Sequence, residues 1–188
     1  IITSISRSAF RHSIHTQNIQ FAVDSEIQTI GADAFMESDI QSILIPPHVK
    51  EIQESAFFGC PNLEKVEFME NSELQIIGPG AFGSTLITSI IIPSHVKEIQ
   101  NSAFSGCKKL KQVEFMENSE LQIIGPNAFK KTPILKFSIP LKLEEICESA
   151  FSECESLKYF TIPNESKLRS IQKGAFSNTI ISNFLIPS

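Results

Sequence analysis

Cysteine and histidine are the residue types in this chain best suited to chemistry, and both recur at a fixed spacing. Cys60, Cys107 and Cys154 follow one another at intervals of 47 residues, and His48 and His95 are also 47 residues apart. Thiols and imidazoles bind metal ions, and thiolates are nucleophiles, so one interpretation is a metal or redox site. Even spacing also fits a repeat in which each copy contributes one equivalent residue. The elements that position these side chains decide between the two.

The pair Ala-Phe gives the length of the repeat. It occurs eight times, and the gaps between successive Phe residues are 25, 22, 25, 22, 25, 22 and 25 residues. The eight Phe residues are Phe10, Phe35, Phe57, Phe82, Phe104, Phe129, Phe151 and Phe176. Periods of this size predict a solenoid, in which each coil buries its apolar face by stacking on its neighbours. We expect residues 1–188 to be a single solenoid domain, a fragment of a longer repeat array that is cut at both ends.

Each coil carries the core pattern L-x-x-L-x-L, whose last two apolar positions have a period of two and predict a short strand. Prolines end five of these strands, since proline supplies no ladder donor: Pro46, Pro93, Pro140, Pro163 and Pro187. One strand per coil predicts a right-handed coil with a parallel sheet of about eight short strands on one face. We expect turns and short 3₁₀ segments on the other face. Gly31, Gly78 and Gly125 precede Phe residues by four positions and predict an unusual backbone angle.

The repeat changes the interpretation of the reactive side chains. Cysteines two coils apart would lie about 9–10 Å from one another, and a disulfide needs Cα atoms within about 7 Å. Cys60, Cys107 and Cys154 occupy the same position in successive 47-residue units, and we call such a set of equivalent positions a column. We therefore interpret this cysteine column as buried free thiols. Cys147 lies off the column, and a Cys147–Cys154 bridge within one coil is the alternative. The histidines fit solvated turns, because no second ligand type recurs beside them at metal spacing.

Composition excludes several function classes. The net charge is −5, and 16 Lys and Arg residues are spread among Glu residues, so we expect no nucleic-acid partner. No apolar stretch approaches the roughly 20 residues that span a bilayer, so we expect no membrane insertion in this segment. No singular group of catalytic side chains and no phosphate-binding glycine loop stands out. We therefore predict that the chain is not an enzyme and needs no cofactor or metal.

The columns resemble a known family. The pattern L-x-x-I-x-I-P-x-x-V-x-x-I-x-x-x-A-F-x-x-C-x-x-L is similar to the BspA-like leucine-rich repeats, repeats of 22–25 residues in bacterial and parasitic-protist surface proteins. Residues 87–110 follow the pattern closely, and the resemblance covers all 188 residues. It implies an α/β-class leucine-rich-repeat solenoid, β-rich. It also implies that Asn71 and Asn118 hydrogen-bond backbone between coils, as an asparagine does in other leucine-rich repeats.

The resemblance further implies a function. Family members are commonly cell-surface proteins that adhere to host proteins or other cells, so we expect a protein-interaction module at the cell surface or secreted. The alternative is an intracellular scaffold or structural spacer built on the same solenoid. The sequon Asn164-Glu165-Ser166 is a possible glycosylation site, which matters only in a secreted protein.

Residues that alternate with the last two apolar positions should face away from the core. One row is Asn18, Ser42, Lys65, Ser89, Gln112, Lys136, Tyr159 and Asn183, and the other is Gln20, Leu44, Glu67, Ile91, Glu114, Ser138, Thr161 and Leu185. We predict that eight of these residues contact a partner: Leu44, Lys65, Glu67, Ile91, Gln112, Glu114, Lys136 and Tyr159. Tyr159 is the single tyrosine and fits an interface anchor. Ordinary strand residues on a solvated face are the alternative.

The two ends of the array predict a second kind of contact. Strands expected at residues 16–21 and 181–186 would each have an unpaired edge, and the second is apolar. Such an edge is a template for pairing with another chain. We expect end-to-end self-association through the C-terminal edge, which charged replacements of Phe184 and Ile186 should reduce.

Overall fold

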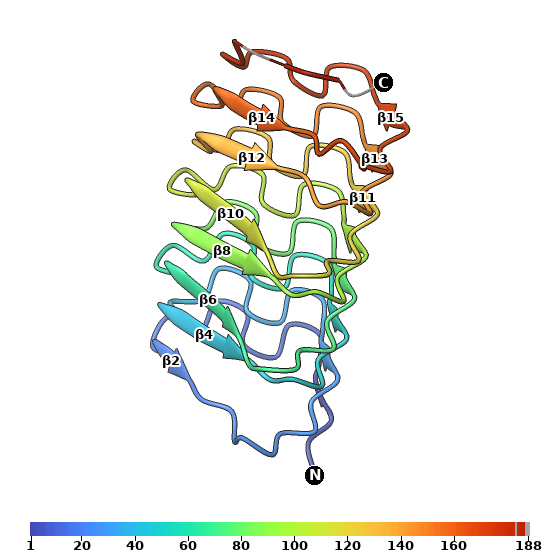
Figure 1. Cartoon of the computed structure of the whole chain (residues 1–188). Coiled ribbons are helices and arrows are strands. Elements are labelled where there is room, and N and C mark those ends of the chain that lie inside the picture. The colour runs from blue at the N-terminus through green and yellow to red at the C-terminus, as the bar shows by residue number, and fades with distance from the viewer. Residues whose placement is uncertain (183, 187–188) are drawn as a thin grey trace.

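The chain winds as a stack of coils, with its N-terminus at one end of the stack and its C-terminus at the other (Figure 1). The structure is a computed structural model and describes residues 1–182 and 184–186. The strands of the L-x-x-L-x-L pattern are β2 (Asn18–Ile19), β4 (Ser42–Ile45), β6 (Lys65–Phe68), β8 (Ser89–Ile92), β10 (Gln112–Phe115), β12 (Lys136–Ser138) and β14 (Tyr159–Thr161). A second series is β1 (Ser4–Ile5), β3 (Thr29–Ile30), β5 (Glu51–Ile52), β7 (Ile76–Ile77), β9 (Glu98–Ile99), β11 (Ile123–Ile124), β13 (Glu145–Ile146) and β15 (Ser170–Ile171).

The parallel solenoid predicted from the repeats is confirmed, with one change in the strand series. All strand pairs are parallel. Among residues 1–182 and 184–186, the strands of the L-x-x-L-x-L pattern number seven instead of about eight, and they form three sheets, β2-β4-β6, β8-β10 and β12-β14. In the range 181–186, the described residues form no strand, and Asn183 and Pro187 lie outside the described residues.

The second strand series makes one continuous sheet that the sequence patterns do not predict. It runs through all eight coils in the order β1-β3-β5-β7-β9-β11-β13-β15. Each strand is only two residues long, so it shows no alternation, and its pairing exists only once coils stack. The short 3₁₀ segments expected on this side are turns instead, and the described residues contain no helix. The described residues therefore contain no helix that would justify the predicted α/β class.

Left-handed residues explain why these turns are not helical. Each Ala-Phe pair has one such residue immediately before Ala and another two positions after Phe, as Ser55 (φ 54°) and Gly59 (φ 68°) do around Ala56-Phe57. The same two positions have positive φ in all eight coils. A 3₁₀ or α-helix needs negative φ at every residue, so the chain turns sharply twice per coil and the Phe side chain points inward.

The Ala-Phe column is the centre of the core. The rings of successive Phe residues stack with centroids 5.1–5.4 Å apart from Phe10 to Phe176. The backbone N–H of each Phe from Phe10 to Phe151 donates to the carbonyl of the Ala one coil further on, at 2.7–2.8 Å. The six rings from Phe35 to Phe151 are fully buried, whereas Phe10 in the first coil is 37% exposed. The predicted inward position of the Ala-Phe pairs is confirmed except in the first coil, where Ala9 and Phe10 are both exposed.

The regular recurrence of Gly31, Gly78 and Gly125 has a different physical cause from the predicted one. None of the three has a positive φ, so the expected unusual backbone angle is wrong. A Cβ atom on Gly78 would lie 2.6 Å from the carbonyl oxygen of Ile52 in the preceding coil, and one on Gly31 would lie 2.7 Å from that of Ile5. Glycine is needed here because the backbones of two coils approach closely.

The cysteine column is structural. The Sγ atoms of Cys60, Cys107 and Cys154 each donate to a Phe carbonyl of an adjacent coil at 3.0 Å. Thr85 Oγ1 lies 3.3 Å from Cys107 Sγ. All four cysteines are free, so the buried-thiol prediction is confirmed and the alternative bridge between Cys147 and Cys154 is wrong. Burial raises the pKa of the Cys107 thiol from 9.0 to about 11.

Replacement of Phe104 by Ala should destabilise the solenoid by about 3–5 kcal/mol, because it removes a fully buried ring from two stacked contacts. Phe10→Ala is the matched control, since Phe10 is partly exposed and stacks on one ring. Thermal and guanidinium unfolding followed by circular dichroism measure the difference. Equal losses of stability in the two variants would contradict this column assignment.

Gly78→Ala should cost about 1–3 kcal/mol, because the new methyl group meets a backbone carbonyl that cannot move without separating two coils. Gln53 occupies the same column of the preceding coil and already has a Cβ atom. Gln53→Ala is therefore the control, and its loss in the free energy of unfolding should be much smaller. A Gly78→Ala protein as stable as the parent would show that the coils are not held this close.

The Cys107 thiol should make the protein less stable at high pH. The unfolded state loses the thiol proton from pH about 9, while the folded state keeps it to about 11, so stability is fully present below pH 9 and is lost through this window. The contribution of one thiol is at most about 1.4 kcal/mol per pH unit. Denaturant unfolding between pH 8 and 11 should show a shallower decline for Cys107→Ser, and identical slopes would contradict the assignment.

Candidate protein-binding face

The even-numbered strands from β2 to β14 lie side by side along one side of the solenoid, and we call their outward surface the sheet face (Figure 1). Strand register places the predicted residues in lateral rows. Leu44 lies opposite Glu67, Ile91 lies opposite Glu114, and Lys136 lies opposite Tyr159. The structure therefore brings the eight predicted partner-contacting residues together on one surface.

All eight of these residues are exposed. The apolar members have large exposed fractions: 42% for Leu44, 53% for Ile91 and 50% for Tyr159. The Nζ atom of Lys158 lies 5.4 Å from the centroid of the Tyr159 ring. The outward direction predicted for these positions is confirmed, while their role in binding stays a prediction.

Polar side chains of the face pair along the strands. Lys65 Nζ lies 2.9 Å from Glu67 Oε1 in β6. At the same positions of β10, Gln112 Nε2 donates to Glu114 Oε1 at 2.6 Å. Exposed pairs of this kind add little stability. Lys65 neutralises the charge of Glu67, whereas the neutral amide of Gln112 leaves Glu114 charged.

Two breaks divide the sheet face, between β6 and β8 and between β10 and β12. At the first break, the backbone N–H of Leu86 still donates to the carbonyl of Leu63 at 3.1 Å. At the second break, Pro133 occupies the position equivalent to Leu86, 47 residues later. Proline has no N–H, so this bond between coils cannot form and the strands are less constrained.

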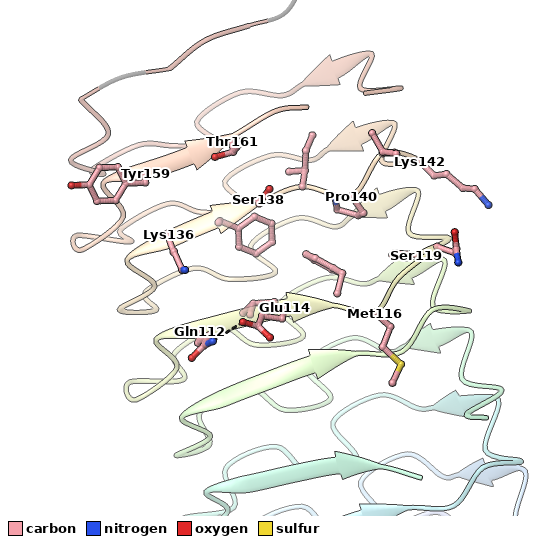
Figure 2. A pocket seen from close by; sticks show the side chains of 16 residues that line it. Gln112, Glu114, Met116, Ser119, Lys136, Ser138, Pro140, Lys142, Tyr159 and Thr161 are labelled. Atoms are coloured by element: carbon pink, nitrogen blue, oxygen red, sulfur yellow. Dashed lines mark hydrogen bonds between the residues drawn. The ribbon is translucent and has the colours of Figure 1, made fainter. Parts of the chain in front are cut away.

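Each break holds a groove on the sheet face. The β10–β12 groove has a volume of about 660 Å³, and the β6–β8 groove has a volume of about 650 Å³. The two are related by the 47-residue repeat, so Glu67 of one corresponds to Glu114 of the other, and Ser89 corresponds to Lys136. Figure 2 shows the β10–β12 groove with the side chains that line it.

Twelve of the 16 lining residues of the β10–β12 groove are absent from the predicted set, among them Phe115, Met116, Leu141 and Lys142. Phe115 is the last residue of β10, and the other three follow the strands, where the alternating pattern ends and outward positions can no longer be assigned. Met116 is 46% exposed and Leu141 is 49% exposed. Apolar residues shortly after a predicted strand, such as Met116 and Leu141, were the signal in the sequence that could have identified these positions.

Asn71 and Asn118 do not have the predicted role. Both are exposed and adopt left-handed conformations, with φ of 58° and 59°, and among the described residues neither side chain makes a hydrogen bond between coils. The buried neighbours Ser72 and Ser119 support the backbone instead, each accepting the N–H two residues ahead at 3.4 Å. Asparagine suits this place because it tolerates the left-handed conformation better than most residues.

The remaining candidate side chains lie apart from one another. His48 Nδ1 lies 2.9 Å from Glu73 Oε1 on the surface, and the part of the chain that the structure describes has no group of three or more metal-ligating side chains. Asn164 is exposed, as a glycan acceptor must be. Across residues 1–182 and 184–186, no helix is long and apolar enough to cross a membrane.

Comparisons with known proteins agree with this geometry. The model of the BspA type leucine rich repeat region matches residues 1–83 and 75–188, with six copies. No curated protein matches the chain.

Two solved structures are similar. One is a leucine rich cell surface protein from Faecalibacterium prausnitzii, 25% identical with a TM-score of 0.53, over 89% of this chain and 48% of that one. The other is the pneumococcal vaccine antigen PcpA, 18% identical with a TM-score of 0.52, over 74% of this chain and 57% of that one. This chain thus spans about half the length of these proteins. Because the repeat model matches from end to end and the coils have the expected parallel geometry, the chain belongs to the BspA-type leucine-rich-repeat family.

Proposed function

We propose that this chain is a protein-interaction segment of a cell-surface or secreted, adhesin-like leucine-rich-repeat protein, and that it binds host or cell-surface proteins through the sheet face. The observation that carries the proposal is the exposure of Leu44, Ile91 and Tyr159 on one preformed surface. Family membership supports a repeat protein of the interaction type. The 25% identical relative is named as a cell surface protein.

The physical argument is preorganisation. A rigid stack orders the side chains before a partner arrives, so binding loses less conformational entropy than it would for a flexible surface. A few exposed apolar anchors usually contribute most of the binding energy, with near-neutral polar contacts around them. Leu44, Ile91 and Tyr159 fit the first role, and the paired side chains of Glu67 and Glu114 fit the second.

Family membership also supports a non-enzymatic role, because repeat solenoids of this type typically bind and do not catalyse. An intracellular scaffold is the competing function, and the four free cysteines suit a reducing compartment. All four are buried, however, and buried thiols persist outside cells as well. Occupancy of Asn164 by a glycan in native material would decide for the surface protein.

For this segment in isolation, we also propose end-to-end association with a second copy. Ile180, Leu185 and Ile186 are exposed at the C-terminal end of the stack, and Phe184 is 37% exposed. Apolar surface of this kind favours association in water. Sedimentation velocity at increasing concentration, with Phe184→Lys and Ile186→Lys as the comparison, would detect association through this end.

Charged or truncating replacements on the sheet face should reduce binding to cells. We expect Leu44→Glu, Ile91→Glu and Tyr159→Ala each to weaken binding of the labelled chain to cultured epithelial cells by about fivefold or more, because each removes an exposed apolar anchor. Flow cytometry measures the effect, and protease treatment of the cells should abolish binding.

Gln75→Glu and Gln122→Glu are the matched controls, because both residues are exposed beside strands of the other sheet. Binding that falls equally in these controls, or that persists on protease-treated cells, would contradict the proposed function. Circular dichroism should show the same fold for all five variants.

A further inference from the structure

The two grooves of the sheet face have the same scaffold but differ in charge. The ionisable residues that line the β6–β8 groove are Glu64, Lys65 and Glu67. Both carboxylates are paired there, Glu67 with Lys65 at 2.9 Å and Glu64 with Lys109 at 2.8 Å. This groove therefore has two acids, both neutralised by neighbouring lysines, and offers no unpaired charge to a partner.

The lining of the β10–β12 groove has more lysines than carboxylates. Its ionisable lining residues are Glu114, Lys136 and Lys142. Glu114 accepts a hydrogen bond from Gln112, whereas neither lysine has a carboxylate within salt-bridge distance in the part of the chain that the structure describes. Of the 16 Lys and Arg residues, nine lack such a carboxylate in the described part of the chain. This groove is distinguished because two of the nine line it together with a single carboxylate, Glu114, so that its lining has a net charge of +1.

Apolar surface lies between the two lysines. Figure 2 shows Lys136 and Lys142 on opposite sides of the groove, with Met116 below them and Tyr159 beside Lys136. Met116 and Leu141 are about half exposed. Phe115 is partly buried, and its ring meets that of Phe137 edge to face at 5.7 Å. The groove thus has an apolar floor with a cation at each end.

We propose that the β10–β12 groove binds an extended segment of the partner protein in which an apolar residue is flanked by acidic ones. The carboxylates would pair with Lys136 and Lys142, and the apolar side chain would contact Phe115, Met116 and Leu141. Alternate residues of an extended chain point the same way, so a Glu-x-Leu-x-Glu sequence presents all three side chains to the groove. The volume of about 660 Å³ lies within the range of specific binding pockets. This inference rests on the proposed function of the sheet face.

The test uses fluorescein-labelled heptapeptides with Leu at the centre and Glu, Gln or Lys two positions to either side. Fluorescence anisotropy with the whole chain measures their affinities. We expect the Glu peptide to bind at least fivefold more tightly than the Gln peptide, and more tightly still than the Lys peptide. Its affinity should fall with added salt, because exposed ion pairs are screened.

Variants of the chain locate the site. Lys136→Glu and Lys142→Glu should each weaken the Glu peptide about two- to fivefold, and the double variant about tenfold. Ser89→Glu and His95→Glu are the matched controls, since these residues occupy the positions equivalent to Lys136 and Lys142 one 47-residue unit earlier. The controls should leave the affinity unchanged.

Three results would overturn the proposal: equal affinity for the Glu and Lys peptides, no binding of any peptide up to millimolar concentration, or equal loss in the control variants. Binding of the chain to phosphatidylserine vesicles but to no peptide would assign the lysines to lipid instead and would also overturn it. Cell binding separates this proposal from the proposed function. If Leu44→Glu abolishes cell binding while the lysine variants do not affect it, the sheet face is the binding surface and the groove is not.

Discussion

The stacking of one Ala-Phe pair on the next is the interaction on which the rest of this molecule depends. The backbone bond from each Phe N–H to the Ala carbonyl of the next coil sets a rise of about 4.8 Å, the spacing of hydrogen-bonded strands. Phe rings with centroids 5.1–5.4 Å apart fill the interior at almost the same spacing. Because each coil contacts only its neighbours, stability is close to a sum of coil and interface contributions, and the fully buried rings contribute much of it.

This constraint explains why the reactive side chains are structural. A cysteine three residues after Phe faces the interior, where its thiol donates to a carbonyl of an adjacent coil and burial raises its pKa. The glycine column follows the same logic, since Gly78 must let the backbone approach Ile52. Cysteine, which is often reactive in other folds, thus serves here as a hydrogen-bond donor to a buried backbone carbonyl. Glycine serves to let two backbones approach closely.

The sheet face has more freedom, because its side chains are not needed for stacking. The copies differ at this face: Lys136 stands at the position of Ser89, and Pro133 stands at the position of Leu86. The proline removes a bond between coils next to a sheet break, while the lysine places an unpaired cation beside it. Two grooves of similar size therefore differ in charge, which allows one solenoid to present two chemically distinct surfaces.

The sequence alone determined the period, the parallel coil, the buried columns and the outward rows, because each depends on one residue type recurring at fixed intervals. Leu44, Ile91 and Tyr159 were assigned to the sheet face in this way, and they lie there. The tertiary structure decided the features that depend on contact between coils. These are the second sheet, the left-handed turns, the close backbone approach at Gly78, and the sheet breaks with their grooves. It also showed that the side chains of Asn71 and Asn118 do not make the expected hydrogen bonds between coils. Two-residue strands and unpaired edges leave no periodic signal, because they are defined only by the neighbour against which they lie.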